Sequence, residues 1–533
     1  MDNTSIGERS ALARFFRWLF SRRGLLSLFA FLVIMPVVLV LLFYAEEDWR
    51  GSYQWNKYRR QLVARGEKLD LEAFIPKPVP DGQNFAATPL IESWFEVGHR
   101  TATVVNFAED DYAAASELVA KPEAARGDRR LMDLETWKLA FEGVRTGGVT
   151  ARQEGATGKL DRAARAQSAP AVLEGMAPDR EAFSELRTAS QRPYSRYPVQ
   201  YDLENPFAIL VPHLAKIKAA SQRLQLQTCA ELAAGQADNA MQDVQLLLCL
   251  IDSTKDEPFL ISMLVRIACT QIAIQPIWEG LAEHRWSEAQ LQALQSRLQQ
   301  FDFLADLKRS LESEQAVGIR MVELTQKKGI NFLQTLQDSH PPPANKIAGS
   351  VLAWFVPSGW YNLEKMNLCR LLHVLMGTAL DTQPKRIAPS QVAANMRVFE
   401  QEINNPGILG RGPSAIVHHR FLATMLLPAL GKTSIKAASA QTAVNEAALA
   451  CALERYRLAK GQYPATLQAL VPQFVASLPN DVVTGEPYKS VPADDGQFKL
   501  YSVGWNESDD GGAPGRTLFD DKEGDWVWNS AAE

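Results

Sequence analysis

The residues with the clearest potential for chemistry are aspartates in two short runs near the C-terminal end. Residues 506–512 read NESDDGG and residues 520–525 read DDKEGD. Carboxylates interspersed with glycines suit a hard cation such as Ca²⁺, which takes six to eight oxygen ligands. The candidate ligands are first Asp509, Asp510 and Asp521, and then Asp520 and Asp525. The runs lack the glutamate at position twelve of an EF-hand loop, and an acidic, solvated loop without metal stays the alternative.

No other pattern indicates catalysis. Seven histidines are scattered along the chain without a His-Glu-x-x-His pair, and no Gly-x-Ser-x-Gly sequence occurs. Residues 431–433 read GKT, as at the end of a phosphate-binding loop, but Leu426 stands where its first glycine is required. A structural or binding role is therefore the first interpretation. An extracytoplasmic hydrolase with its site in the helical part of the chain stays an alternative.

The composition is that of a folded protein without a nucleic-acid footprint. Of the 533 residues, 46% are hydrophobic and 22% are charged, which is ordinary for globular domains. The net charge of −5 excludes the basic surface expected of a protein that binds nucleic acid. The five cysteines are widely separated and odd in number, so we expect buried core thiols rather than a disulfide framework.

The elements that would position these residues begin with a membrane segment. Residues Gly24–Tyr44 form 21 consecutive residues without a charge, and as a helix they would span about 30 Å, the thickness of the hydrocarbon core. Five arginines precede the segment, namely Arg9, Arg14, Arg17, Arg22 and Arg23. The positive-inside rule then predicts a single-pass protein with a cytoplasmic N-terminus and an extracytoplasmic, periplasmic bulk. Cleavage after Ala45, or export through the Arg22-Arg23 pair, stays an alternative.

The remaining chain is predicted to be mostly α with a small α+β C-terminal domain. Six segments are expected: 1–23 basic and cytoplasmic, 24–44 transmembrane, 45–90 a juxtamembrane helix and Pro-rich strap, 91–200 mixed helical with a flexible loop at 146–169, 201–430 α-helical, and 431–533 the C-terminal module. Within the helical segment, Gly235-Gln-Ala-Asp238-Asn-Ala240 interrupts two apolar-periodic runs. This α-helical hairpin resembles one tetratricopeptide unit.

The C-terminal module has clear start and stop signals. A long helix is predicted over 433–460, because Gly461 suits a helix C-terminus and Pro464 blocks continuation. A short helix at 467–471 follows. Two strands at 487–491 and 497–503, joined by the turn 494–496, and a third strand at 525–528 would complete a small antiparallel sheet.

This module resembles the head of the major pseudopilins of type II secretion systems. The shared pattern is Tyr456-x-x-x-x-Gly461-x-Tyr463-Pro464, followed by Leu478-Pro479 and by Tyr501-Ser-Val-Gly504. The resemblance implies a helix leading into a three-stranded sheet, with a calcium site in the loop after the last strands, where the aspartates named above lie. A pseudopilin, however, carries its membrane span on this helix, whereas residues 418–428 here are charged and short.

Together these features predict a membrane-anchored extracytoplasmic protein of structural or interaction type. Its membrane contact would be Gly24–Tyr44, and its protein partners would belong to a secretion or envelope assembly. A calcium-dependent binding module is a further alternative.

Overall fold

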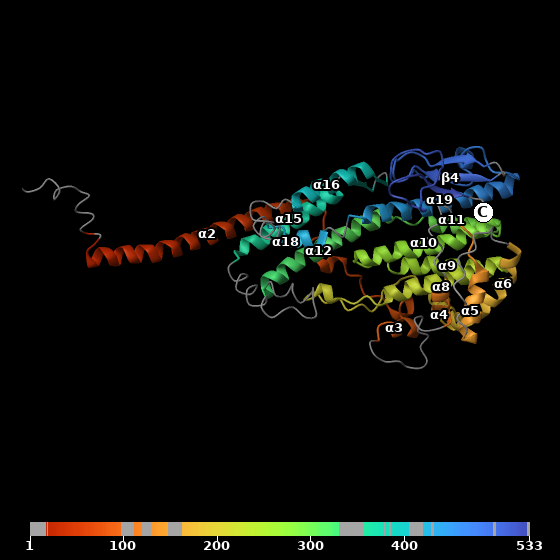
Figure 1. Ribbon diagram of the computed structural model, residues 1–533, viewed down its shortest axis with the longest axis horizontal. Helices are drawn as coiled ribbons and strands as arrows, with labels where there is room; N and C mark the ends of the chain where they lie inside the picture. The colour runs from red at the N-terminus through yellow and green to blue at the C-terminus, as the bar shows by residue number, and fades with distance from the viewer. Residues whose placement is uncertain are drawn as a thin grey trace, which may run out of the picture. The chain divides into compact units, whose positions relative to one another are not determined.

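The computed structural model describes most of the chain. The described residues are 18, 20–96, 111–119, 129–147, 162–329, 356–377, 379–382, 385–404, 419–427, 431–493 and 497–529. They fall into two compact units, each assembled from separate stretches: unit 1 is Met1–Glu67, Met321–Cys369 and Pro406–Ala423, and unit 2 is Lys68–Arg320, Arg370–Asn405 and Thr424–Glu533. The predicted fold class is confirmed, because helices dominate and the small antiparallel sheet lies at the C-terminal end (Figure 1). The boundaries of the six predicted segments stay a prediction.

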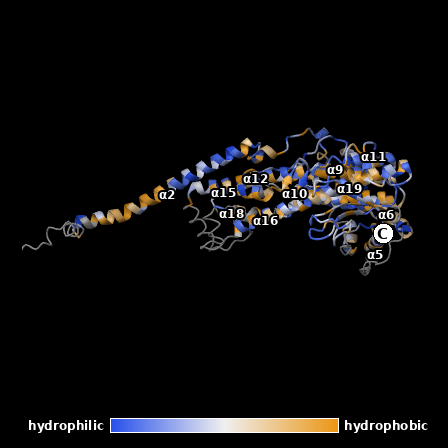
Figure 2. Cartoon of the chain, turned by 90° about the horizontal axis from the view of Figure 1, so that it is seen from above, coloured by the Kyte–Doolittle hydropathy of each residue, from blue (hydrophilic) through white to orange (hydrophobic). Residues whose placement is uncertain are grey.

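Unit 1 is built around one long helix, α2 (Arg22–Ala64). The predicted span and the predicted juxtamembrane helix are thus one element, which continues through Pro36. Its apolar stretch is long enough to cross a membrane, and none of that stretch is buried. Figure 2 shows the change from continuous apolar colouring in the first half of α2 to mixed colouring in the second.

Three further elements contribute to unit 1. They are the end of α12 (Phe303–Lys328), the first part of α15 (Ser358–Met376) and the start of α18 (Phe421–Leu426). All three lie within residues 201–430, the segment that is predicted to be α-helical.

Unit 2 begins with a helical cluster. Its helices are α4 (Asp111–Leu118), α5 (Leu134–Thr146), α6 (Arg162–Gly175) and α8 (His213–Ala233), which enclose a core that includes Phe141 and Val172. The flexible loop predicted over 146–169 is wrong for its last third, since residues from Arg162 onward form α6. Its alanines favour helix more strongly than the nearby polar residues oppose it. Residues 148–161 of that loop lie outside the described residues.

The helical hairpin is confirmed and forms the centre of unit 2. Gly235, at a φ of +75°, joins α8 to α9 (Ala237–Ser253). The next helix, α10 (Leu260–Ala282), packs against α8, α9 and α19. It is apolar and long enough to span a membrane, but 61% of its apolar window is buried, as expected of a core helix. A capping box of Ser287 and Gln290 starts α11 (Glu288–Leu298).

The C-terminal module has the predicted order of elements. Helix α19 (Thr433–Lys460) ends at Gly461, at a φ of +82°, and leads to β3 (Lys489–Pro492), β4 (Phe498–Ser502) and β5 (Trp526–Asn529). The antiparallel sheet has the order β3-β4-β5, with Leu500 opposite Ser490 and Trp528. The predicted turn 494–496 lies outside the described residues.

Helix α19 is buried around its circumference rather than on one face. Burial extends from Thr433 through Glu454 with few interruptions, because α10 and α11 contact the helix in addition to β4 (Figure 1). Many of these positions are alanine, and small side chains let neighbouring helix axes approach closely. The module is therefore packed into the helical part of unit 2.

Shorter elements connect these parts. They are η2 (Leu71–Phe74), η3 (Asp81–Gln83), α3 (Pro89–Ser93), η4 (Ala177–Asp179), α7 (Arg180–Ala189), η5 (Pro206–Ala208), β1 (Leu380–Asp381), β2 (Arg386–Ile387), α16 (Pro389–Asn404) and η7 (Leu467–Leu470). Within the Pro-rich strap, residues 74–82 contain no α-helix and lead into the short η3.

Candidate functional site

The most densely built site in unit 1 lies where α2 leaves its apolar stretch and meets α15. A Cβ added to Gly51 would lie 2.1 Å from the Gly359 carbonyl oxygen, and one added to Gly359 would lie 2.0 Å from the Glu47 carbonyl oxygen. Only glycine at both positions allows this approach of the two backbones. We refer to Glu47, Asp48, Gly51, Gly359 and Trp360 as the membrane-proximal junction.

Two carboxylates of α2 hold the start of α15 at this junction. The Gly359 amide donates to Asp48 Oδ1 at 2.7 Å, which satisfies a free N–H at the helix start. The Trp360 indole donates to Glu47 Oε2 at 2.9 Å, and Arg50 also donates to Glu47. Burial raises the pKa of Glu47, but the hydrogen bonds from Arg50 and Trp360 outweigh it and leave the pKa lowered. Glu47 is therefore a charged, bonded group at neutral pH.

Further contacts extend the junction along both helices. Lys365 lies over the Trp55 ring at 5.1 Å, a cation–π geometry. Glu364 accepts from the backbone amides of Phe421 and Ala423 at 3.1 and 3.3 Å and so caps the start of α18. The second half of α2 is consequently a folded part of unit 1.

The predicted calcium ligands lie in the loop between β4 and β5, and each has its own surroundings. The buried Asp525 accepts from the amides of Asp510 and Gly512, at 3.2 and 2.6 Å, and burial raises its pKa. Asp509 is exposed and pairs with the Lys489 ammonium, which lowers the pKa of the aspartate. Asp520 accepts from the Lys522 and Glu523 amides at 2.9 and 3.2 Å.

The loop therefore brings two predicted ligands together without forming a cage. Asp510 and Asp525 are neighbours through the Asp510 amide, whereas Asp521 is exposed. Among the described residues, no group of three or more His, Cys, Asp or Glu side chains is arranged to hold a metal ion. Four of the five carboxylates, all except Asp521, accept hydrogen bonds from N–H donors of the protein, so the geometry fits these donors better than a cation. The calcium site stays a prediction.

Glu454, on α19, is a carboxylate of the C-terminal module with several charged and polar partners. It accepts from Tyr463 Oη at 2.6 Å, from Arg457 Nε at 2.8 Å and Nη2 at 2.6 Å, and it bonds His284 Nδ1 at 2.9 Å. Burial would raise its pKa, but the bonds from Arg457, His284 and Tyr463 outweigh burial and lower the pKa to about 2. Tyr463, which follows the end of α19 at Gly461, thus bonds back to Glu454 on that helix.

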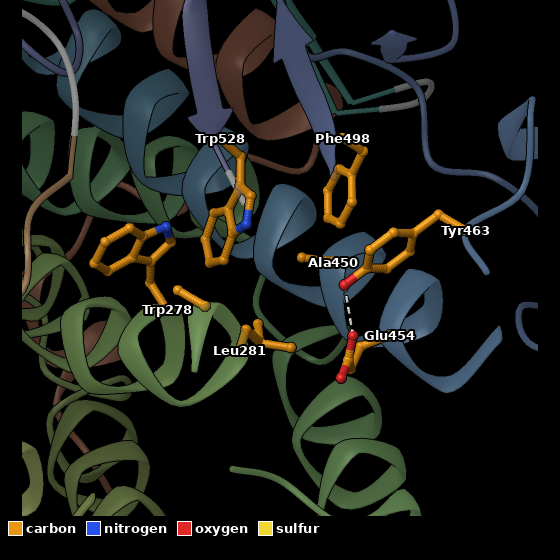
Figure 3. A pocket seen from close by; sticks show the side chains of 8 residues that line it. Trp278, Leu281, Ala450, Glu454, Tyr463, Phe498 and Trp528 are labelled. Carbon is orange, nitrogen blue, oxygen red and sulfur yellow. Dashed lines mark hydrogen bonds between the residues drawn. The ribbon is translucent and has the colours of Figure 1, made fainter. Parts of the chain in front are cut away.

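Beside this cluster lies a small aromatic cavity (Figure 3). Its lining comes from α10, α19, the segment after α19 and the sheet, and comprises Trp278, Leu281, Ala282, Ala450, Glu454, Tyr463, Phe498 and Trp528. The room for a water-sized sphere is about 10 Å³, about what one water molecule needs. The cavity is a packing gap between α10 and the module, and the Trp278 indole donates across the same boundary to the Asn529 carbonyl at 2.7 Å.

A buried serine, histidine and glutamate meet in unit 2, but not in a nucleophile–base order. His213 Nε2 bonds Glu257 Oε1 at 2.6 Å, and Ser262 Oγ donates to Glu257 Oε2. The His213 ring is stacked on Tyr197 with centroids 4.3 Å apart. A catalytic triad requires the serine to bond the histidine, whereas here both bond the glutamate. This cluster stabilises the core and gives no support to the hydrolase alternative.

Several residues with defined roles were missed from the sequence. Glu454 bonds Tyr463, nine residues away across a helix end, and His284, just after the end of α10, and no local sequence pattern predicts either contact. Asp481 accepts from Val483, Ser502 and Val503 and so joins the loop before the sheet to β4. The buried-thiol prediction is confirmed, since all five cysteines are free and only Cys249 is not fully buried.

Replacing Gly359 by alanine should open the membrane-proximal junction. The new Cβ would collide with the Glu47 carbonyl, and overpacking of this kind costs about 1–3 kcal/mol. Hydrogen exchange of amides 45–60 in the full chain should therefore accelerate on the order of tenfold, since 1.4 kcal/mol is a factor of ten. Gly82→Ala is the matched control, because nothing lies within 4 Å of its Cβ. Equal exchange in both variants would contradict the proposed contact.

Replacing Glu454 by glutamine should destabilise the protein near neutral pH, by on the order of 2 kcal/mol for lost charged hydrogen bonds. The folded-state pKa of Glu454, about 2, lies below the ordinary glutamate value of 4.5. The stabilisation is therefore fully present above about pH 4.5 and is lost as the pH falls towards 2. Thermal unfolding of wild type and variant should differ at pH 7 and converge in acid. Glu288→Gln removes an exposed partner of Arg455 and should change little; a pH-independent difference would refute the assignment.

The calcium prediction is tested by calorimetry on the full chain. Calcium binding at the predicted loop should release or absorb heat and raise the unfolding temperature, and Asp525→Asn should abolish both effects. An unchanged chain at millimolar calcium would end this prediction.

Comparison with known proteins gives no match against which these sites could be compared. No family model, no curated protein and no solved structure matches it. The function proposed next is accordingly argued from the residues described above.

Proposed function

We propose that this chain is a single-pass membrane protein that serves as a structural or interaction component of a secretion or envelope assembly. Its N-terminus would lie in the cytoplasm and its bulk outside it, in the periplasm. The pseudopilin-like module would act as a fixed head for protein partners.

The observation that carries this proposal is the membrane-proximal junction. Helix α2 runs without a break from its unburied apolar stretch into contacts with α15 that involve Glu47, Asp48 and Gly51. Cleavage after Ala45 would cut this helix two residues before the first of these contacts. An uncleaved anchor is therefore favoured over a removed signal peptide.

Two features support a single crossing with the proposed orientation. The five arginines before the apolar stretch favour a cytoplasmic N-terminus. Among the residues that the structure describes, the second helix long and apolar enough to cross a membrane is α10, which is largely buried and packs against α8, α9 and α19.

The burial of α19 supports a head that does not polymerise through its helix. In a filament of pseudopilin type, the long helix would be the element that packs between subunits. Here α10, α11 and β4 already cover it. A docking role for the outer surface of the module is consistent with this packing.

Orientation is testable by reversing the charge before α2. In spheroplasts, whose outer membrane has been opened, protease added to the outside should degrade the bulk of the wild-type chain. Replacing Arg14, Arg17, Arg22 and Arg23 by glutamate should protect a large fraction of it, because the positive charge sets the orientation. Arg59→Gln with Arg60→Gln, beyond the anchor, is the control and should leave the digestion unchanged.

The interaction role is tested by crosslinking in intact envelopes through a photoreactive residue placed at the exposed Glu507. A discrete adduct with another envelope protein is expected. A chain that crosslinks to nothing and purifies alone from detergent would contradict the interaction role while leaving the membrane anchor intact.

A further inference from the structure

An exposed aromatic pair lies on α2 immediately beyond the apolar stretch. Trp49 and Tyr53 are 68% and 55% exposed, and their rings are stacked with centroids 5.8 Å apart and planes 17° apart. They are four residues apart and therefore share one face of the helix. The face occupied by Gly51 and Trp55 is buried on the other side. Helix α2 therefore exposes a large apolar surface at Trp49 and Tyr53.

The pair begins at the outer edge of the lipid headgroup layer, so that a tilt of α2 towards this face would bring its rings into the layer. Trp49 and Tyr53 follow Tyr44 by five and nine residues, about 7.5 and 13.5 Å along the axis at 1.5 Å per residue. The headgroup region extends about 5–7 Å beyond the hydrocarbon on each side. Helical side chains lean towards the N-terminus, which here means towards the membrane, so both rings lie nearer to the bilayer than their Cα atoms.

The surrounding charges favour this occupant over a protein surface. The exposed carboxylate of Glu46, three residues before Trp49, lies 3.9 Å from Arg50, which offsets its charge. The exposed side chain one turn beyond Tyr53 is Lys57, a cation. Aromatic rings are favoured at the membrane–water interface, and a cation just beyond them is attracted to the phosphate groups of the lipids.

We infer that the Trp49–Tyr53 pair binds the phospholipid headgroup layer and draws this face of α2 towards the bilayer. The inference rests on the proposed membrane anchoring and adds the residues that set the depth and tilt of the anchor. Because α15 is bonded to the same stretch of α2 through Asp48, the pair also sets the distance of that part of unit 1 from the lipid surface.

Spin labels on the full chain in phospholipid nanodiscs test this inference. A nitroxide at the exposed Asn56, on the same face as the pair, reports its depth through collisions with oxygen, which concentrates in lipid, and with a water-soluble nickel chelate. Changing Trp49 and Tyr53 together to serine should release this face, so that chelate collisions at position 56 increase at least about twofold. Gln61→Ser, at an exposed polar position on another face, is the control and should leave them unchanged.

The outcomes separate the inference from the anchor itself. Unchanged collisions at position 56 in the double variant would overturn lipid binding by the pair. A label at position 49 that is shielded from both oxygen and chelate would overturn it in favour of a protein contact. A label at position 34, in the middle of the apolar stretch, should be reached by oxygen and not by chelate; the reverse result would refute the membrane anchor.

Discussion

The contact between Gly51 and Gly359 is the constraint on which the proposed arrangement of unit 1 depends. Because neither residue has a Cβ, the backbone of α15 lies close to α2. Asp48 can then accept a hydrogen bond from the Gly359 amide, and Glu47 can accept one from the Trp360 indole. A side chain at either glycine would push the two helices apart and break both of these hydrogen bonds. The polar bonds then fix the position of α15 along α2, and the aromatic pair is left on the opposite face. The close packing of α2 on α15, the two hydrogen bonds and the exposure of the aromatic pair therefore all depend on the absence of side chains at Gly51 and Gly359.

Unit 2 uses small residues for a similar purpose on a larger scale. The alanines of α19 let α10, α11 and the sheet surround it, and the boundary with α10 is completed by the Trp278 bond and the His284–Glu454 contact. The resemblance to a pseudopilin head is a resemblance of local motif. In this chain the motif is embedded in a helical body, and its Tyr463 serves an internal ion cluster. This embedding is why we propose a fixed head instead of a filament subunit.

The parts of the structure that could be predicted are those specified by neighbouring residues. The apolar stretch Gly24–Tyr44, the turn at Gly235 and the end of α19 at Gly461 each follow from local propensity and backbone freedom. The loop at 146–169 was partly wrong because a few glycines and polar residues concealed the helix-forming alanines after Arg162. The junction of α2 with α15 could not be predicted, since its two glycines are about three hundred positions apart. The same applies to the acidic loop: Asp509 was visible, but its partner Lys489 is brought close only by the pairing of β3 with β4.

The unbroken course of α2 makes the anchor sensitive to helical phase. Each residue adds 1.5 Å and 100° of rotation in an α-helix. A single residue inserted between Tyr44 and Glu47 would leave the junction intact and would turn the apolar stretch before it by 100° relative to the junction. Seven inserted residues would restore the phase to within about 20° while lengthening the helix by about 10 Å. If this stretch is the proposed membrane anchor, its rotation and its depth in the bilayer are both fixed relative to the junction by the number of residues between them.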